Sequence, residues 1–376
     1  MKHLKLFIAL CLILLTQATV RATPFFARTY DMTCKTCHAG YPRLNEFGLK
    51  FKANNFRIAG MDAGEFLAWQ KTLPVSVQVS RYNEKFLPGK GHADYTDTQV
   101  LAGGLLTKKT AFYLHHSLWI DNVPVPFPTY DAWVQQVLDE KTKTMLKIGQ
   151  FELPYAYSPG THLVSAFPPQ IFGVGLAGND VRLGSALRGV QLSGLVADKA
   201  RWYLAYGTPA TLTPGNINGR HEFLGQFHDV FARVSTSGFD KNIGAFTYLT
   251  DQARNPADPG STERGYRLGL DGSYLWRDYQ FFAMSVYGED KDPLGDGRRG
   301  TFRSGFVEAD KMLLPWVGVN LRLEAQSVSV GGRQTYSDGK GIGLRVYPVP
   351  FVRLTAEYIR QEHGRSESAL SASTAF

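Results

Sequence analysis

The sequence predicts an all-β protein, an antiparallel transmembrane barrel of about sixteen strands that follows a short α-helical segment. Three observations predict this fold. Apolar and polar residues alternate from residue 75 to the end of the chain, short links between the predicted strands take turns with long ones, and aromatic residues recur near strand ends. Alternation alone also fits a soluble sandwich, so the link lengths decide between the two.

The stretch 316–326 shows the alternation most clearly. One face carries Val317, Val319, Leu321, Leu323 and Ala325, and the other carries Gly318, Asn320, Arg322, Glu324 and Gln326. Because successive side chains of a strand point to opposite sides of a sheet, this pattern indicates a half-buried strand. Residues 266–274 and 352–358 show the same alternation.

Segments of this kind can be marked along the whole of this region. We expect strands at 75–83, 95–106, 110–120, 131–139, 143–152, 184–195, 200–207, 226–236, 241–250, 264–275, 279–289, 303–310, 315–328, 340–347, 351–362 and 366–376. Tight turns are expected at 107–109, 140–142, 196–199, 237–240, 276–278 and 348–350, and long links at 121–130, 153–183, 208–225, 251–263, 290–302 and 329–339. Short periplasmic turns that alternate with longer extracellular loops are typical of outer-membrane barrels. The longest link is rich in proline and aromatic residues, and it is a candidate to fold inward and narrow the pore.

Aromatic residues near the strand ends agree with the interfacial girdles of a membrane barrel. They are Tyr82, Tyr95, Tyr130, Trp133, Trp202, Tyr274, Trp276, Tyr287, Trp316, Tyr347 and Tyr358. The chain ends in Phe376, and a terminal aromatic residue is typical of the last strand of such barrels. An even number of strands, with both ends in the periplasm, places the N-terminal segment at the periplasmic mouth or inside the lumen.

The first residues predict export. A basic start, an apolar core from Leu6 to Leu15 and the small-x-small site Val20-Arg21-Ala22 together indicate a signal peptide at 1–22. The expected organisation is therefore a signal peptide at 1–22, a small N-terminal segment at 23–72 and a porin-like barrel at 73–376. The predicted location is the bacterial outer membrane.

One pentapeptide in the N-terminal segment carries chemistry. Cys34-Lys35-Thr36-Cys37-His38 is a C-x-x-C-H run, which predicts one covalent c-type haem (haem c) with His38 as the proximal ligand of its iron. A disulfide or redox pair is the alternative for the two cysteines. The adjoining histidine, the absence of a βαβ pattern around the pair and the helix that follows favour haem.

The residues around this run predict short helices. Pro42 is placed for a first helical turn, Leu44, Phe47 and Phe51 fall on one face, and Asn54-Asn55 predict the helix end. A second amphipathic piece is expected over 64–71. About forty residues are too few to wrap a haem, so we expect the barrel lumen to supply the remaining wall.

The chain has a formal net charge of +8. Its lysines and arginines are scattered, and no basic run or nucleic-acid motif is present, so nucleic acid is not an expected partner.

The haem iron of a pure electron carrier needs a sixth ligand, since an open position favours ligand binding or catalysis. The candidates are Met61, His92, His115, His116 and His162, of which Met61, His115 and His162 are the preferred alternatives. On the strand 110–120, His115 shares a polar face with Ser117 and is expected to face the lumen. His116 shares the opposite, apolar face and is expected to face lipid; with the reverse register the two histidines exchange faces.

Three groups of residues together resemble the fused outer-membrane cytochrome–porins of iron-oxidising bacteria. They are Ala27-Arg28, Cys34-x-x-Cys37-His38 and Pro42-x-Leu44-x-x-Phe47-Gly48-x-x-Phe51-Lys52. The resemblance covers 24–56 and implies one N-terminal c-type haem joined to a barrel. The runs Thr29-Tyr30-Asp31 and Asn55-Phe56 depart from the pattern expected of that family.

The sequence therefore predicts an outer-membrane electron-transfer protein with its haem inside or at the mouth of a porin-like barrel. Electrons would move between an extracellular donor or acceptor and a periplasmic carrier such as a soluble cytochrome c. The resemblance implies Fe(II) as a donor, which would make the protein an Fe(II)-oxidising oxidoreductase. A solute-conducting porin in which the haem segment is a plug or redox sensor is the alternative, and a peroxidase-like haem enzyme is a third.

Overall fold

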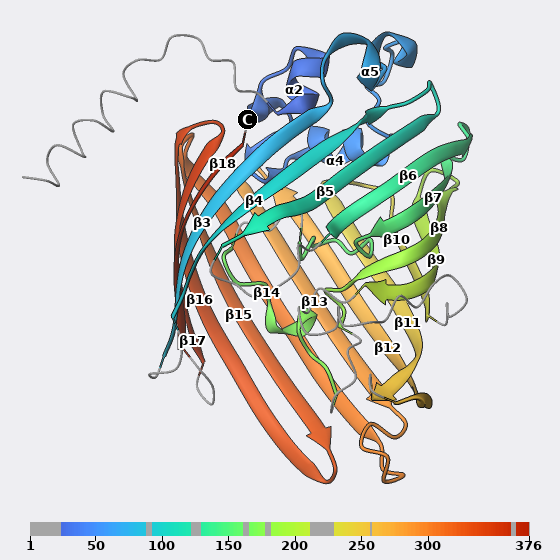
Figure 1. The fold of residues 1–376 in the computed structure, drawn as a ribbon, viewed down its shortest axis with the longest axis vertical. Coiled ribbons are helices and arrows are strands. Elements are labelled where there is room, and N and C mark those ends of the chain that lie inside the picture. Colours follow the sequence, from blue (N-terminus) through green and yellow to red (C-terminus); the bar gives the residue numbers. More distant parts are fainter. Residues whose placement is uncertain are drawn as a thin grey trace, which may run out of the picture.

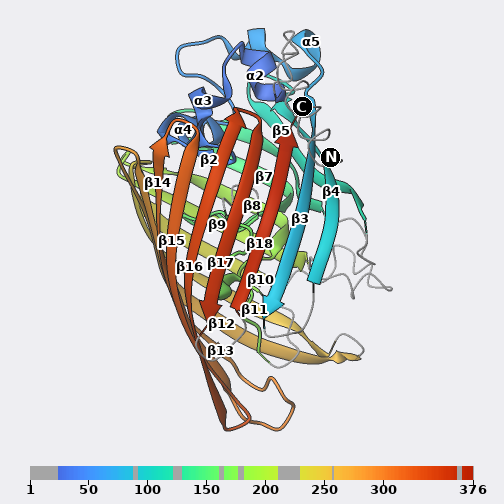
Figure 2. The ribbon, with the colours of Figure 1, turned by 90° about the vertical axis from the view of Figure 1, so that its left-hand side faces the viewer.

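The computed structural model describes residues 24–87, 92–121, 129–160, 165–176, 182–210, 229–255, 258–361 and 366–375. They form a closed antiparallel barrel of sixteen strands with a group of short helices at one end (Figures 1 and 2). The predicted fold class is therefore confirmed. The signal peptide predicted at 1–22, His162, Phe376 and the side chain of His92 lie outside the described residues.

The N-terminal segment is built from short elements. They are α2 (Phe25–Tyr30), α3 (Cys34–Cys37), β1 (His38–Gly40), β2 (Arg43–Leu44), α4 (Glu46–Ala53), η1 (Ala63–Phe66) and α5 (Ala68–Lys71). Among the described residues, none of the helices has both the length and the apolar character that crossing a bilayer requires.

Helix α4 begins later than its sequence suggests. Asn45 is its N-cap, and the Asn45 side chain accepts a hydrogen bond of 2.9 Å from the amide of Gly48, which has no partner within the helix. Pro42 lies in the turn between β1 and β2, so its expected place in a first helical turn is wrong. The predicted helix end is confirmed, because α4 ends at its C-cap Asn54 and the backbone of Asn55 has a φ of 59°.

The barrel strands follow one another around the wall. They are β3 (Val75–Leu87), β4 (His92–Leu105), β5 (Thr110–Ile120), β6 (Thr129–Asp139), β7 (Thr144–Phe151), β8 (Ala186–Val196), β9 (Ala200–Ala210), β10 (Asp229–Thr236), β11 (Lys241–Asn255), β12 (Asp258–Trp276), β13 (Tyr279–Asp290), β14 (Gly300–Leu314), β15 (Val317–Val330), β16 (Arg333–Val349), β17 (Val352–Gln361) and β18 (Ser366–Ala375). Each strand pairs with its neighbour in sequence, and β18 pairs with β3, from Ser366 opposite Leu87 to Ala375 opposite Gln78. Closure leaves no strand edge unpaired. Every predicted strand overlaps one of these.

The faces of the strands follow the predicted alternation. On β15, Leu321 and Leu323 are 57% and 55% exposed on the outside of the barrel, whereas Asn320 and Arg322 are each 1% exposed on the inside. The barrel therefore has an apolar exterior and a polar interior. The helical segment and the end of β18 lie at the same end of the barrel (Figures 1 and 2). Strand β3 leaves that end and β4 returns to it, so the β4–β5 turn and every second turn after it lie at that end as well.

Two of the expected long links are wrong. Strand β11 extends to Asn255 and β12 starts at Asp258, so most of 251–263 is strand. In the same way β15 and β16 are separated only by Gly331 and Gly332, although 329–339 reads as a loop. At the tip of the second hairpin, the side chains of 333–336 are all exposed, so this part of β16 lacks the alternation that marks a strand between lipid and lumen.

Some of the aromatic residues assigned to girdles face inward instead. Tyr82, Tyr95, Tyr130 and Trp133 line an internal cavity, and Tyr347 is 7% exposed. In β3, Tyr82 lies on the same side as the buried Ser80, because the two are separated by one residue. Trp276 and Trp316 are 47% and 52% exposed beside the tight turns, as a girdle requires.

The link between β7 and β8 folds into the lumen. Its buried side chains Tyr157, Ile171 and Phe172 belong to the largest apolar cluster of the described chain. Phe172 packs 6.0 Å from the ring of Phe306 on β14. We call the described parts of this link, 152–160, 165–176 and 182–185, the lumen loop. The expectation that the longest link turns inward is confirmed.

Candidate functional site

The C-x-x-C-H run forms a compact turn between α3 and β1. Both cysteines lie in α3, one helical turn apart, and His38 begins β1. Asn45 holds this turn, because its backbone amide donates to the carbonyl of Cys37 at 2.9 Å and its side chain donates to the carbonyl of Thr36 at 3.0 Å. The same residue caps α4, so the run and the helix are one local unit.

The ring of His38 is held in one tautomer. Its Nδ1 lies 3.1 Å from the carbonyl oxygen of Pro42 and 3.3 Å from that of Arg43. Carbonyl oxygens only accept hydrogen bonds, so Nδ1 carries the proton and the lone pair is on Nε2. Burial lowers the pKa of His38 to about 4, against the opposing effect of these two hydrogen bonds. The imidazole is therefore neutral at pH 7, which is the form that binds a metal.

The thiols do not resemble those of a redox enzyme. Burial raises the pKa of Cys37 to about 11, and the neighbouring Cys34 adds to this shift. Burial also raises the pKa of Cys34. Reactive C-x-x-C cysteines have lowered pKa values instead. Neither cysteine is in a disulfide.

The run faces a large cavity inside the barrel. The cavity has a volume of about 1030 Å³ and is lined by both thiols and His38 together with side chains of the lumen wall. Aromatic rings form much of that wall, among them Tyr82, Tyr95, Tyr113, Tyr130 and Trp133. The rings of Tyr82 and Tyr95 stack at 4.9 Å, and those of Tyr113 and Trp133 lie 5.8 Å apart.

The predicted sixth ligands are placed differently. His115 on β5 is 6% exposed and lines the same cavity as His38, as its expected lumen face requires. Met61 is 50% exposed and is not among the residues that line the cavity. His162 lies outside the described residues.

The neighbouring histidine, His116, has a hydrogen-bond partner on the outer face of the wall. Its Nδ1 lies 2.8 Å from the hydroxyl of Thr129 on β6. The register between β5 and β6 shifts between His115 and His116, which makes room for this contact. The histidine on the apolar face therefore has a local polar partner.

A buried ion-pair network joins the N-terminal segment to the opposite wall. Arg43 pairs with Glu308 and Asp310 of β14, each at 2.9 Å. Arg322 of β15 contacts Glu308 at 3.5 Å, and Arg345 of β16 pairs with Asp310. Sequence reasoning missed this network. Its one sequence signal is that alternation puts Glu308 and Asp310 on the inner face of a strand, where buried carboxylates need partners.

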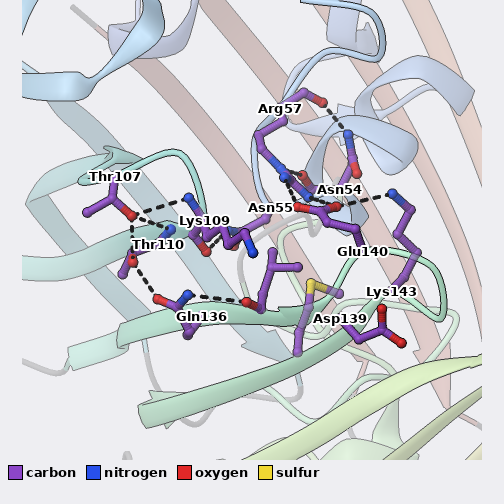
Figure 3. A network of polar contacts seen from close by, with 12 residues as sticks. Asn54, Asn55, Arg57, Thr107, Lys109, Thr110, Gln136, Asp139, Glu140 and Lys143 are labelled. Carbon is purple, nitrogen blue, oxygen red and sulfur yellow. Dashed lines mark hydrogen bonds and ion pairs between the residues drawn. The ribbon is translucent and has the colours of Figure 1, made fainter. Parts of the chain in front are cut away.

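A second set of contacts fixes the segment to the barrel rim (Figure 3). Arg57 Nη1 lies 2.5 Å from Glu140 in the turn between β6 and β7, and Lys143 lies 3.5 Å from the same carboxylate. The Asn55 side chain donates to the carbonyl of Lys109 at 3.1 Å. The segment is thus bound to two tight turns of the barrel, β4–β5 and β6–β7, as well as to β14.

The lumen loop is tied to inward carboxylates. The amide of Gln170 donates to Glu324 at 2.6 Å, and the amide of Ala166 donates to Glu357. Arg322 donates to the carbonyl of Phe167 at 2.9 Å. These bonds hold the loop across the lumen beside the aromatic cavity.

Within the described ranges, no three His, Cys, Asp or Glu side chains gather closely enough to hold a metal ion. The thiols of Cys34 and Cys37 and the imidazoles of His38 and His115 line the same aromatic cavity.

No family model matches the chain, and no curated protein sequence matches it. Solved outer-membrane proteins share its fold. A loop-deletion mutant of OmpT from Vibrio cholerae is 11% identical with a TM-score of 0.56, over 80% of this chain and 98% of that chain. OmpF of Salmonella typhi in complex with daunomycin is 10% identical with a TM-score of 0.57, over 80% and 97%. The outer membrane channel DcaP of Acinetobacter baumannii is 11% identical with a TM-score of 0.54, over 80% and 96%. At these identities the likeness shows the fold alone: the chain is a porin-like barrel with an added N-terminal segment.

Proposed function

We propose that this chain is an outer-membrane electron-transfer protein with one covalent c-type haem inside its barrel lumen, near the end where the N-terminal segment lies. Cys34 and Cys37 attach the haem, and His38 is the proximal ligand of its iron. One observation carries the proposal: both thiols and His38, whose Nδ1 is held by backbone carbonyls, line one cavity enclosed by the barrel. When bound, the haem supplies a one-electron couple, and the chain positions it and limits its contact with water.

The cavity fits such a group. Ligand cavities commonly measure roughly 300–1,000 Å³, and this one, at about 1030 Å³, is large enough for a macrocycle. Its aromatic walls suit a flat apolar ring. It also contains a buried imidazole nitrogen of His115 that has no hydrogen-bond partner among the described residues. Charged side chains such as Lys52, Asp131 and Lys147 also line the cavity, and they could pair with the polar edge of a haem.

The exterior supports a membrane location. Outward side chains such as Leu270, Leu321 and Ile342 are 64%, 57% and 55% exposed. Apolar surface costs about 25 cal/mol per Å² in water, so a wall of this kind is stable in lipid. The likeness to solved outer-membrane barrels supports the same location.

The arrangement suits transfer across the outer membrane. The apolar band of such barrels is about 25 Å tall, and a haem within the lumen lies closer to an external donor than one at the periplasmic rim. Arg43 and Arg57 fix the haem segment in that position. We propose Fe(II) or another extracellular donor or acceptor on one side and a soluble periplasmic electron carrier on the other.

A second function, solute conduction with the haem segment as a plug or sensor, is favoured by one observation. The inner face carries buried polar residues such as Asn320, Arg322 and Glu324, as the wall of an aqueous channel does. The lumen loop narrows that channel without filling the cavity.

Sealed vesicles separate the two functions. The holoprotein is reconstituted with an impermeant oxidant, ferricyanide, inside, and Fe(II) is added outside. Reduction of the haem followed by reduction of the enclosed ferricyanide supports electron transfer. Release of a trapped sugar without net electron transfer supports the porin.

The Cys34→Ser/Cys37→Ser variant is the matched control. It keeps the barrel and loses the attachment sites, so the rate of ferricyanide reduction should fall to that of empty vesicles. A correctly matured wild-type protein that carries no covalent haem would refute the proposal.

A further inference from the structure

His115 has an unusual environment for a histidine in a barrel wall. It is 6% exposed, its ring stacks on Tyr130 at 4.6 Å with an angle of 30°, and it lines the cavity that His38 faces. Its Nδ1 is buried and has no hydrogen-bond partner in the part of the chain that the structure describes. An unpaired buried nitrogen costs about 1–3 kcal/mol, a cost that a ligand bound at Nδ1 would offset.

Polar neighbours of His115 fix which nitrogen is free. Its Nε2 lies 2.8 Å from Oε1 of Gln99 on β4. The other end of the Gln99 amide donates to Asp97, and Asp97 also accepts from the hydroxyl of Ser117 at 2.9 Å.

This chain of contacts sets the direction of each hydrogen bond. Because the Gln99 amide nitrogen faces the Asp97 carboxylate, its carbonyl oxygen faces the imidazole, and that oxygen can only accept. Nε2 of His115 therefore carries the proton, and the lone pair is on Nδ1. In His38 the accepting oxygens lie beside Nδ1 instead, so Nδ1 carries the proton and the lone pair is on Nε2.

Other side chains that could serve are less suited. The sulfur of Met145, which also lines the cavity, accepts a hydrogen bond of 3.2 Å from Gln135. Met61 is half exposed and does not line the cavity. Met32 lines it, but it lies on the same short connection as the attachment turn, two residues before Cys34.

We propose that Nδ1 of His115 is the second axial ligand of the haem, with Gln99 as the residue that positions the ring. This inference rests on the proposed function, because it requires the haem. It makes the iron six-coordinate through one ligand from the N-terminal segment and one from the barrel wall. The N-terminal segment and the barrel then share a metal centre, and each fixes the other. Six-coordination also excludes peroxidase-like chemistry, which needs an open position.

Absorption and electron paramagnetic resonance spectra of the purified holoprotein test this. The wild type should be low-spin. His115→Ala should become high-spin, and added imidazole should restore the low-spin spectrum. His116→Ala is the matched control: it removes the neighbouring histidine, which faces outward toward Thr129, and should keep the wild-type spectrum.

Two further variants test the assignment of roles. His115→Met should remain low-spin, with a higher midpoint potential, because methionine ligation raises the potential of a haem. Gln99→Leu keeps the ligand and loses the orienting acceptor, so it should bind external imidazole more readily than the wild type and less readily than His115→Ala.

Several outcomes overturn the inference. A high-spin wild type does so, and so does a His115→Ala variant that stays low-spin without imidazole; loss of low-spin character in Met32→Leu would then point to Met32. Heat-modifiable migration and covalent haem staining check that each variant folds and matures. A wild type without haem instead refutes the proposed function, which keeps the two failures distinct.

Discussion

Arg43 of the N-terminal segment contacts Glu308 of β14 at 2.9 Å, and both side chains are almost completely buried. The same guanidinium reaches Asp310 at 2.9 Å, so it makes two charged contacts with one strand. Arg43 and Glu308 are 265 positions apart in the sequence, so this is a tertiary contact that no local pattern encodes. It places the turn that carries His38 against the lumen wall.

Arg43→Met should loosen the N-terminal segment without opening the barrel. Removing one partner of a buried ion pair costs about 3–5 kcal/mol. Without Arg43, Glu308 still contacts Arg322 and Asp310 still contacts Arg345. We therefore expect the docking of the segment to lose about 2 kcal/mol, which is roughly a 30-fold change in its opening equilibrium. Protease cleavage within the N-terminal segment measures that equilibrium.

Lys50→Met is the control for that experiment. Lys50 pairs with Glu46 on the exposed side of α4, and exposed pairs contribute about 0–1 kcal/mol. Equal cleavage rates in the Arg43 and Lys50 variants would show that Arg43 does not fix the segment.

The wall of the barrel could be predicted because its residues obey a local rule. A strand between lipid and lumen must alternate, as 317–326 does, and the sequence shows that directly. The rule fails where both faces of a strand contact water. Gln334 and Thr335 therefore read as loop residues, although the strand β16 includes both.

The site could be predicted only in part. The C-x-x-C-H run and the lumen face of His115 follow from spacing and alternation. The contacts of Arg43 and of Gln99 depend on which strands become neighbours, and the inward aromatic wall depends on register. Tyr82 shares the inner face with Ser80 because one residue separates them, whereas its position near a strand end predicts a girdle residue.

Gly48→Ala should impair haem attachment. A Cβ at this position would lie 2.2 Å from the carbonyl oxygen of Cys37 and 2.9 Å from the side chain of Leu44. The Cys37 carbonyl belongs to the backbone and accepts a hydrogen bond from the amide of Asn45, so moving it aside would break that bond. We expect α4 to separate from the attachment turn and the yield of covalent haem per barrel to fall severalfold, as read by haem staining.

Gly173→Ala is the matched glycine. Its Cβ would lie 3.6 Å from the nearest atom, an ordinary contact. A Gly48→Ala protein with the haem content of this control would show that α4 does not need its close approach to the attachment turn.

The contact between Arg57 and Glu140 should make docking of the segment sensitive to acid. The hydrogen bond from Arg57 lowers the pKa of Glu140 below its ordinary value of 4.5. Because the pKa of Glu140 is lower in the docked state, its charge stabilises docking at pH values above 4.5. That stabilisation is lost as pH falls through the lowered pKa of the docked state. Because the Glu140 side chain is 43% exposed, the contribution is about 0.5 kcal/mol.

Protease cleavage of the segment, followed from pH 6 to pH 3, measures this effect. Glu140→Gln should already cleave faster at pH 6, and its rate relative to wild type should approach one as pH falls through the lowered pKa of Glu140. A constant ratio across that range would mean that Glu140 does not titrate in the docking equilibrium.

Releasing the lumen loop should increase ion conductance. Gln170 and Ala166 donate backbone hydrogen bonds to Glu324 and Glu357, so Glu324→Ala/Glu357→Ala removes two anchors of the loop. Single-channel recordings in planar bilayers should show a larger and noisier conductance, by about twofold or more if the loop leaves the lumen of a barrel this wide. Asp296→Asn is the control, because Asp296 pairs with Arg298 in an exposed link far along the chain from the lumen loop. Normal heat-modifiable migration must accompany the change, and an unaltered conductance in a folded double variant would show that the loop does not set the pore.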